Sequence, residues 1–276
     1  MNTSRKLKVP CKLKVPLQQQ VIWLVGASSG IGEALVQQLA GCCEQLVISS
    51  RNHHKLVQLA RQHPGVSVIP ADVTDPDSMK QAAALIEEIF GRLDCLLFNA
   101  GTCEYLKVQQ FDSELVKRVM DTNFNGLVNT IEAGLPLLRQ SQRGYLIGVS
   151  SSVTYLALSR AEAYGASKAA MTYLLESLRV DLADEQIDVS VVSPGFVKTP
   201  LTDRNNFPMP MLISAGQAAR TIVDALPARP LEIHFPKRFT WLLKILGSLP
   251  APLRLALARR MTSKSSRPAN SQEHLS

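Results

Sequence analysis

The chain lacks the features of several protein classes. Only five of its 276 residues are cysteine, and no apolar run reaches the roughly 18 residues that a membrane-spanning helix needs. The cysteines are odd in number and show no C-x-x-C spacing, which argues against a disulfide framework and a zinc site and fits a reducing compartment. No apolar stretch of the signal-peptide type follows the basic N-terminus. We therefore expect a cytoplasmic protein without a bound metal.

Acidic residues are scarce at both ends of the chain. The formal net charge is +7, yet residues 17–236 hold 17 basic and 22 acidic side chains. Residues 1–16 hold five Lys or Arg and no acid, and residues 237–276 hold eight Lys or Arg and only Glu273. The basic character belongs to the ends, so it predicts no nucleic-acid-binding face on the body of the protein.

Between these ends, apolar runs alternate with helical patterns. Strands are expected over 21–25, 45–49, 66–70, 95–100, 145–150, 188–194 and 231–236, and helices over 31–40, 75–91, 112–139, 161–183 and 214–226. Strands that are apolar throughout are buried on both faces of a sheet. The sequence therefore predicts an α/β fold, a single-domain Rossmann-like, doubly wound parallel sheet flanked by helices. Ligands of such folds bind beyond the carboxyl ends of the strands.

The segment VGASSGIG (25–32) lies between the first strand and the first helix. Glycines there allow positive φ and let the backbone approach a pyrophosphate at the helix N-terminus. The spacing is G-x-x-x-G-x-G and not the common G-x-G-x-x-G, so a plain tight turn would also explain it. Its position after the first strand favours a dinucleotide site that comprises Gly26, Ser28, Ser29, Gly30, Ile31 and Gly32.

Arg51 follows the second strand, where many NAD-binding folds carry an acid for the ribose 2′-hydroxyl. A guanidinium can pair with a 2′-phosphate through two hydrogen bonds, whereas an acid would repel it. Arg51 therefore predicts NADP(H) as the preferred cofactor and NAD(H) as the second choice, and a solvated loop arginine is the alternative. At the same sheet edge, Asp72 and Val73 follow the third strand, and the segment Asn99, Ala100, Gly101 follows the fourth.

Tyr164 and Lys168 lie one helical turn apart on a predicted helix. An ammonium within about 4–6 Å stabilises a phenolate and lowers the tyrosine pKa from its usual value near 10. Such a tyrosine can exchange a proton with an alcohol or carbonyl oxygen while hydride moves at the carbon, a contribution of ~10²–10⁴ in rate. The Y-x-x-x-K pattern alone occurs by chance on many helices. Upstream of this pattern, the serines at 150–152 supply hydroxyls just after the fifth strand, and Asn123 lies within the long predicted helix 112–139.

These motifs, taken in order, resemble the short-chain dehydrogenase/reductase family of the compact single-domain kind, over about residues 19–236. The resemblance implies that Tyr164 is the general acid/base. Lys168 would lower the pKa of Tyr164 and hydrogen-bond the nicotinamide ribose, and Asn123 would hold a water in a proton relay. A serine would bind the substrate oxygen. Alignment of SSV with the usual family pattern favours Ser152, whereas counting thirteen residues back from Tyr164 gives Ser151.

The resemblance also assigns cofactor contacts. Gly26, Gly30 and Gly32 would carry the pyrophosphate, Asp72 and Val73 the adenine, and Asn99 the ribose region. The nicotinamide carboxamide would be covered by Pro194, Gly195, Val197 and Thr199. The chain departs from the family at Val25, where threonine is usual, and at Phe98, where asparagine is usual.

The segment 199–215 would form the lid over the substrate, with an apolar surface from Phe207, Met209, Met211 and Leu212. These side chains predict a hydrophobic substrate, although they could simply pack on the body. The leading interpretation is an NADP(H)-dependent oxidoreductase that interconverts a secondary alcohol and a ketone or aldehyde. The alternatives are a non-catalytic NADP(H)-binding sensor or scaffold, and a nucleotide-sugar epimerase or dehydratase. The glycine spacing and the lack of a C-terminal sugar-nucleotide domain count against the last.

The chain divides into a basic N-terminal arm (1–18), a dinucleotide-binding and catalytic domain (19–236) and a basic amphipathic C-terminal extension with a polar tail (237–276). Residues 237–261 could contact the inner face of a membrane, pack on a partner subunit or be disordered. Trp241 suits a membrane interface, and Leu253, Leu257 and Met261 repeat at helical spacing. Residues beyond Arg260 are expected to be disordered. The family resemblance implies a homodimer or homotetramer that pairs through helices 112–139 and 161–183.

Overall fold

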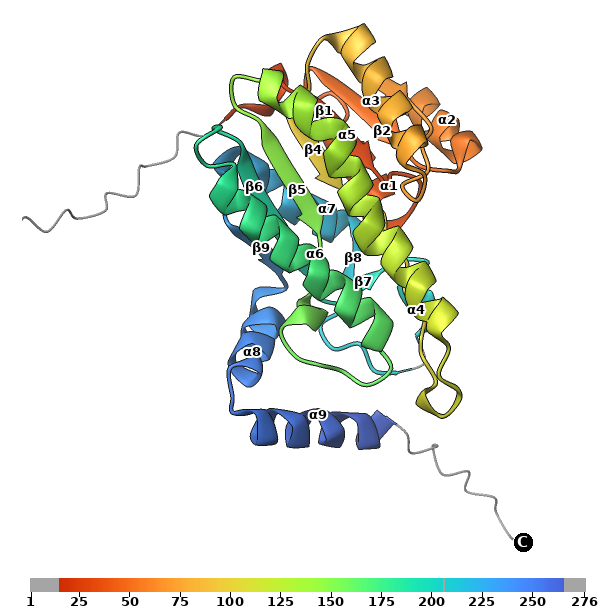
Figure 1. Cartoon of the computed structure of the whole chain (residues 1–276), viewed down its shortest axis with the longest axis vertical. Coiled ribbons are helices and arrows are strands. Elements are labelled where there is room, and N and C mark those ends of the chain that lie inside the picture. The colour runs from red at the N-terminus through yellow and green to blue at the C-terminus, as the bar shows by residue number, and fades with distance from the viewer. Residues whose placement is uncertain (1–14, 206, 266–276) are drawn as a thin grey trace, which may run out of the picture.

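A seven-stranded parallel sheet forms the centre of the computed structural model, which describes residues 15–205 and 207–265 (Figure 1). The strand order is β3-β2-β1-β4-β5-β6-β9, so the chain begins in the middle of the sheet and winds out to each side in turn. This confirms the predicted doubly wound architecture. The strands are β1 (Val21–Val25), β2 (Gln45–Ser49), β3 (Val66–Val68), β4 (Cys95–Phe98), β5 (Tyr145–Val149), β6 (Asp188–Pro194) and β9 (Glu232–Phe235).

Helices cover both faces of the sheet (Figure 1). Successive side chains of a strand point to opposite faces, so a strand buried on both faces is apolar throughout. In β1, Trp23 packs into the core on one face, and Ile22 and Leu24 pack into the core on the other. The helices on the Ile22 side are α1 (Gly30–Leu39), α2 (His53–Gln62) and α7 (Ala215–Ala225). Those on the Trp23 side are α3 (Pro76–Phe90), α5 (Gly126–Gln140) and α6 (Glu162–Asp181), and α4 (Ser113–Met120) packs beside α6.

Some elements were not expected from the sequence. Helix α2 buries only Leu56 and Leu59, which are too few apolar residues for a clear periodic pattern. The N-cap residue of the helix is Asn52, whose side chain accepts a hydrogen bond from the Lys55 amide at 3.0 Å. A second sheet pairs two very short strands, β7 (Val197–Lys198) and β8 (Ile213–Ser214). The 3₁₀ turns are η1 (Leu17–Gln19), η2 (Val108–Gln110), η4 (Ser152–Thr154), η5 (Thr202–Arg204) and η6 (Leu226–Ala228).

A π-helical turn, η3 (Asp121–Asn125), interrupts the single helix predicted over 112–139. Within it, Asn123 is fully buried, and its Oδ1 accepts a hydrogen bond from the Thr102 amide at 2.7 Å. Its Nδ2 donates to the Thr102 carbonyl and to Ser167 Oγ, both at 2.9 Å. These bonds tie the segment after β4 to α6. Helical periodicity cannot reveal so local a change of hydrogen bonding.

The C-terminal extension begins as part of the body. Helix α8 (Lys237–Gly247) buries Phe239 and Leu243 against Leu156, so the boundary expected at residue 236 divides segments that pack together. Helix α9 (Ala251–Ser265) lies apart from the sheet layers (Figure 1). It continues past Arg260, where disorder was expected. Residues 1–14 of the arm and 266–276 of the tail lie outside the described residues. Among the residues that are described, no helix is both long and apolar enough to cross a membrane.

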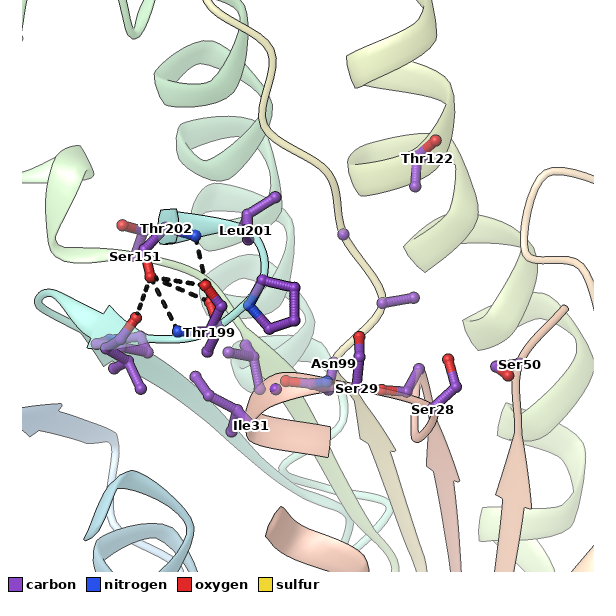
Figure 2. A pocket seen from close by; sticks show the side chains of 18 of the residues that line it. Ser28, Ser29, Ile31, Ser50, Asn99, Thr122, Ser151, Thr199, Leu201 and Thr202 are labelled. Atoms are coloured by element: carbon purple, nitrogen blue, oxygen red, sulfur yellow. Dashed lines mark hydrogen bonds between the residues drawn. The ribbon is translucent and has the colours of Figure 1, made fainter. Parts of the chain in front are cut away.

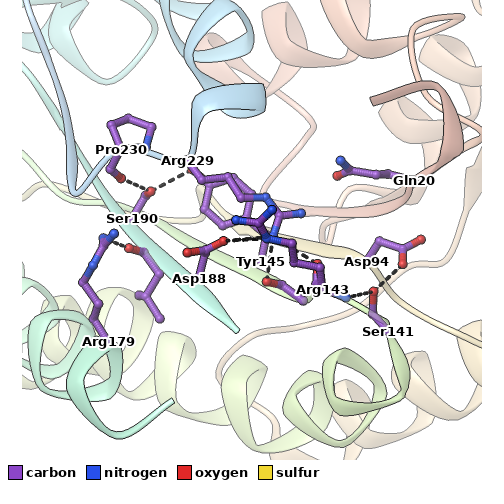
Figure 3. A network of polar contacts seen from close by, with 12 residues as sticks. Gln20, Asp94, Ser141, Arg143, Tyr145, Arg179, Asp188, Ser190, Arg229 and Pro230 are labelled. Carbon is purple, nitrogen blue, oxygen red and sulfur yellow. Dashed lines mark hydrogen bonds and ion pairs between the residues drawn. The ribbon is translucent and has the colours of Figure 1, made fainter. Parts of the chain in front are cut away.

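A buried arginine joins the amino-terminal ends of β5 and β6 (Figure 3). Arg229 is 1% exposed, and its Nη1 donates to the carbonyls of Arg143 and Gly144, both at 3.0 Å, and to the Asp188 carboxylate at 3.2 Å. Its guanidinium lies 4.7 Å from the centre of the Tyr145 ring. This network lies at the amino-terminal ends of the strands, whereas ligands of such sheets bind at the carboxyl ends. Arg229 therefore supports the fold and does not contact a ligand at the carboxyl ends.

We expect Arg229→Ala to lower the free energy of unfolding by about 3–5 kcal/mol, because two carbonyls and a carboxylate lose a buried charged partner. Urea denaturation followed by circular dichroism measures the change. Arg61→Ala, an exposed position on α2, should alter stability by less than about 0.5 kcal/mol. An Arg229→Ala variant as stable as the parent protein would show that the network contributes nothing.

Candidate active site

A cavity of about 350 Å³ lies at the carboxyl edge of the sheet. Figure 2 shows Ser28 and Ser29 in the turn after β1, with Asn99 beside them and Ser50 after β2. Thr199 directly follows β7 and lines the cavity from the other side (Figure 2). The cavity brings together most of the residues predicted to bind a cofactor. These are Gly26, Ser28, Ser29, Gly30, Ile31, Arg51, Val73, Asn99, Ala100, Gly101, Tyr164, Lys168, Pro194, Gly195, Val197 and Thr199.

Two predicted cofactor residues do not line this cavity. A Cβ on Gly32 would lie 2.0 Å from the Gly26 carbonyl oxygen, so this glycine allows α1 to pack closely on the preceding turn. The Asp72 carboxylate accepts hydrogen bonds from the amide and the hydroxyl of Thr74, at 3.0 and 2.8 Å. Gly32 thus has a packing role and Asp72 a role in a local turn, and their contacts with a cofactor stay predictions.

The glycine loop presents helix-terminal amides to the cavity. Gly26 has φ +89°, and a Cβ there would lie 2.4 Å from the Ala100 amide nitrogen. Asn99 Nδ2 donates to the Gly26 carbonyl at 2.8 Å, which fixes the loop against the end of β4. Ser29 is the N-cap residue of α1, but its side chain makes no capping bond. The first-turn amides of α1 and the nearby hydroxyls are therefore suited to an anion.

The charge of the cavity wall is one-sided. Its described lining residues include two cations, Arg51 and Lys168, and no Asp or Glu. Arg51 is exposed and stands between Ser50 and Asn52, directly after β2. The Arg51 guanidinium and a helix N-terminus match a ligand with several phosphate groups. These residues fit a phosphorylated dinucleotide.

Burial sets the protonation of the predicted acid/base pair. Lys168 is 3% exposed, and its Nζ donates to the Val149 carbonyl at 2.8 Å. Burial lowers the pKa of Lys168 to about 7. Burial also raises the pKa of Tyr164 well above 10, and a hydrogen bond with Ser151 opposes this rise only in part. Lys168 Nζ lies 5.8 Å from the Tyr164 ring centre, and the lowering of the Tyr164 pKa by Lys168 stays a prediction. At neutral pH the phenol is protonated and can act as a proton donor.

The three serines after β5 have different surroundings. Ser150 Oγ is buried and bonds to the Lys168 carbonyl (3.1 Å) and to Thr172 Oγ1 (2.7 Å). Ser151 faces the first cavity and hydrogen-bonds with Tyr164. Ser152 is 5% exposed; it does not line that cavity but lines a second, apolar cavity beside it. Ser151 is the one of the three described serines that lines both cavities, because β5 ends at Val149 and a 3₁₀ turn then directs the next side chains differently. The sequence alignment preferred Ser152, and the choice between the two serines stays a prediction.

Asn123 also lies outside the cavity lining. Both protons of its amide are used, by the Thr102 carbonyl and by Ser167. In the structure, the Asn123 side chain therefore positions its neighbours. Its role in holding a relay water stays a prediction from the family resemblance.

A second cavity, of about 460 Å³, adjoins the first. Both are lined by Ser151, Tyr164, Gly195, Leu201 and Thr202. Most of the remaining wall of the second cavity is apolar, from Val153, Leu158, Phe196, Phe207, Pro208, Pro210, Phe239 and Leu243. The hydroxyls of Tyr164 and Ser151 thus stand where a cation-lined cavity meets an apolar one.

The wall of this second cavity was only partly predicted. Of the four apolar lid residues expected, Phe207 lines it, whereas Met211 and Leu212 are exposed. The sequence analysis missed Tyr105 and Cys103 after β4, Arg160 before α6 and the two α8 residues, Phe239 and Leu243. An apolar run within the basic segment KRFTWLLKIL was the only signal for the last two.

No group of three or more His, Cys, Asp or Glu side chains could hold a metal ion within the part of the chain that the structure describes. Four cysteines in that part, Cys42, Cys43, Cys95 and Cys103, have free thiols.

Known proteins resemble this chain along most of its length. An "uncharacterized oxidoreductase" of Myxococcus xanthus (strain DK1622) is 35% identical over 242 residues, which cover 86% of this chain and 96% of that protein. "11-beta-hydroxysteroid dehydrogenase 1A" of Arabidopsis thaliana is 33% identical over 256 residues, covering 83% of this chain and 72% of the relative.

A solved structure agrees in fold. It is a crystal structure of a short chain dehydrogenase from Burkholderia cenocepacia J2315 in complex with NADP, with a TM-score of 0.77. The two sequences are 25% identical, and the match covers 90% of this chain and 99% of that one. The family model described as "short chain dehydrogenase" matches residues 20–208. The fold, the sheet-edge cavity and these matches together show that the chain belongs to the short-chain dehydrogenase/reductase family of oxidoreductases.

Proposed function

We propose that this protein is an NADP(H)-dependent oxidoreductase that interconverts a secondary alcohol and a ketone or aldehyde on a hydrophobic small molecule. The observation that carries the proposal is the junction of the two cavities, where Tyr164 and Ser151 face both. A non-catalytic sensor would not need this arrangement. A relative named as a hydroxysteroid dehydrogenase and a neighbour that binds NADP support the same assignment.

The proposed cofactor contacts follow from the cavity wall. The first-turn amides of α1, with Ser28 and Ser29, would hold the pyrophosphate. Arg51 would pair with the 2′-phosphate, since no Asp or Glu is among the described residues that line the cavity. Asn99 and Lys168 would lie along the nicotinamide ribose. When bound, the nicotinamide supplies or accepts a hydride at its C4. NAD(H) would lack the phosphate partner of Arg51 and bind more weakly.

Proton transfer would be the task of Tyr164. Its neutral phenol would donate a proton to the carbonyl oxygen during reduction, and its phenolate would accept that proton during oxidation. Ser151 would hold the same oxygen through its hydroxyl. Lys168, with a pKa of about 7, would be cationic part of the time near neutral pH and would then stabilise the phenolate. The apolar wall of the second cavity would exclude water from the reacting carbon and bind the hydrophobic part of the substrate.

We also propose that the protein forms a homodimer or homotetramer through α4, α5 and α6. Exposed apolar side chains on these helices, among them Val128 and Val180, support a contact there.

Tyr164→Phe should lower kcat/KM by at least about a hundred-fold, because the substrate oxygen loses its proton donor. The rate is followed by NADPH absorbance with a hydrophobic ketone selected by screening. Fluorescence titration should show NADPH binding nearly unchanged. Tyr173→Phe, on the exposed face of the same helix, is the matched control and should retain activity. Near-normal turnover in Tyr164→Phe would rule out this mechanism.

Arg51→Asp should shift the ratio of NADPH to NADH affinity towards NADH by at least about tenfold, or 1.4 kcal/mol, since a carboxylate repels the 2′-phosphate. Separate fluorescence titrations with the two cofactors measure the ratio. Arg61→Asp, on the exposed surface of α2, controls for the general change in charge. An unchanged ratio in Arg51→Asp would show that this side chain does not contact the phosphate.

Ser151→Ala should reduce kcat by about 10²–10³, the usual effect of removing one hydrogen-bond donor to a developing oxyanion. Ser152→Ala should reduce it by less than about tenfold, since Ser152 lines only the second cavity whereas Ser151 lies at the junction of both. Steady-state kinetics of the two variants under the same conditions decide between them. The reverse order would restore Ser152 as the substrate-binding serine.

A further inference from the structure

Helix α8 is apolar on two opposite faces. Phe239 and Leu243 point into the body and are buried, whereas Trp241, Leu242 and Ile245 are 55%, 52% and 59% exposed. A surface helix of a globular protein normally carries polar residues on its outer face. Three large apolar side chains on the outer face of an eleven-residue helix therefore indicate a partner surface.

Helix α9 follows α8 along the chain and lies beyond the sheet layers (Figure 1). Leu253 and Leu255 are 58% and 51% exposed there. Isolated helices of about fifteen residues are only marginally stable in water. Since α9 lies apart from the body, contact with another surface would stabilise it. We call the exposed residues Trp241, Leu242, Ile245, Leu253 and Leu255 the α8–α9 surface.

The charged side chains that α8 and α9 themselves carry are of one sign. Residues 237–265 contain no Asp or Glu, while Lys237 and Arg238 are exposed at the start of α8 and Arg259 is exposed on α9. A second copy of the chain in a two-fold contact would place these cations against their own counterparts. A nucleic acid would match the charge but would leave Trp241 and the aliphatic side chains without apolar partners. An anionic lipid surface matches both.

We propose that the α8–α9 surface docks on anionic lipid membranes, with the apolar side chains at the headgroup boundary and the cations against acidic headgroups. The contacts of Trp241 support this placement. Its ring packs against His234 at 5.7 Å between centroids and lies 5.4 Å from Lys244 Nζ, so it is held in place while more than half exposed. Aromatic rings held in this way are suited to membrane interfaces, where one side is apolar and the other wet.

Docking would place the apolar cavity beside the lipid. Phe239 and Leu243 line that cavity from the inner face of the helix whose outer face would touch the membrane. A hydrophobic substrate could then pass from the bilayer to Tyr164 along a short path. This consequence rests on the proposed function, whereas the docking itself does not.

The test uses the full-length protein and two kinds of vesicle, phosphatidylcholine alone and phosphatidylcholine mixed with phosphatidylserine. The chain has two tryptophans, and Trp23 is fully buried, so a change in emission on adding vesicles reports on Trp241. We expect a shift to shorter wavelength with the anionic vesicles, and Trp241→Phe should abolish it. Co-sedimentation should show binding to anionic vesicles more than about tenfold tighter than to neutral ones, and added salt should weaken it.

A matched pair of variants separates docking from a general change of the surface. Ile245→Glu and Ile89→Glu alter isoleucines that are each 59% exposed on a helix, α8 and α3. Ile245→Glu should weaken vesicle binding at least about tenfold, and Ile89→Glu should leave it unchanged. Thermal unfolding and NADPH titration of both variants check that the fold is intact.

Three results would overturn the docking proposal. The first is that the protein binds neither kind of vesicle, and the second is that Ile245→Glu and Ile89→Glu weaken vesicle binding equally. The third is that the parent protein binds no lipid but forms a dimer that Ile245→Glu disrupts, as measured by sedimentation velocity. The last result would assign the surface to a second copy of the chain. Because these measurements read lipid binding and not turnover, an inactive protein that binds vesicles would contradict the proposed function alone.

Discussion

The close approach of two backbone turns is the contact on which the cavity depends. The turn after β1 touches the turn after β4 so closely that a side chain at Gly26 would overlap the Ala100 amide. Asn99 holds the two turns together through its hydrogen bond to the Gly26 carbonyl. Gly32 has no side chain, so the first turn of α1 packs directly against the Gly26 carbonyl. β1 pairs with β4 on one side and with β2 on the other. Arg51, which directly follows β2, therefore stands at the same sheet edge and lines the cavity.

Burial is the second constraint, and it acts on protonation. Tyr164 and Lys168 are both shifted towards their neutral forms by the surrounding protein. A neutral phenol beside Ser151 is ready to give a proton, and a lysine whose pKa is about 7 can change charge near neutral pH. Simple spacing suggested a phenolate beside a fixed ammonium, because the spacing of residues along a helix carries no information about desolvation.

The sequence predicted long, regular elements better than local ones. All seven strands of the main sheet and the helices with clear apolar periodicity were expected, since each buries a face that repeats along the chain. Helix α2 and the π-helical turn at Asn123 were not, because the first buries only two leucines and the second depends on bonds to Thr102 and Ser167. The choice between Ser151 and Ser152 also required the path of the chain after β5.

The sequence by itself determined the doubly wound sheet, the glycine loop and the pairing of Tyr164 with Lys168, because these follow from apolar periodicity and from spacings of a few residues. Only the tertiary structure decided what surrounds them. It brought α8 from the presumed extension into the wall of the apolar cavity, where Phe239 and Leu243 lie. Contacts between segments far apart in the chain depend on how helices and loops pack over the sheet edge, and no local pattern encodes that packing.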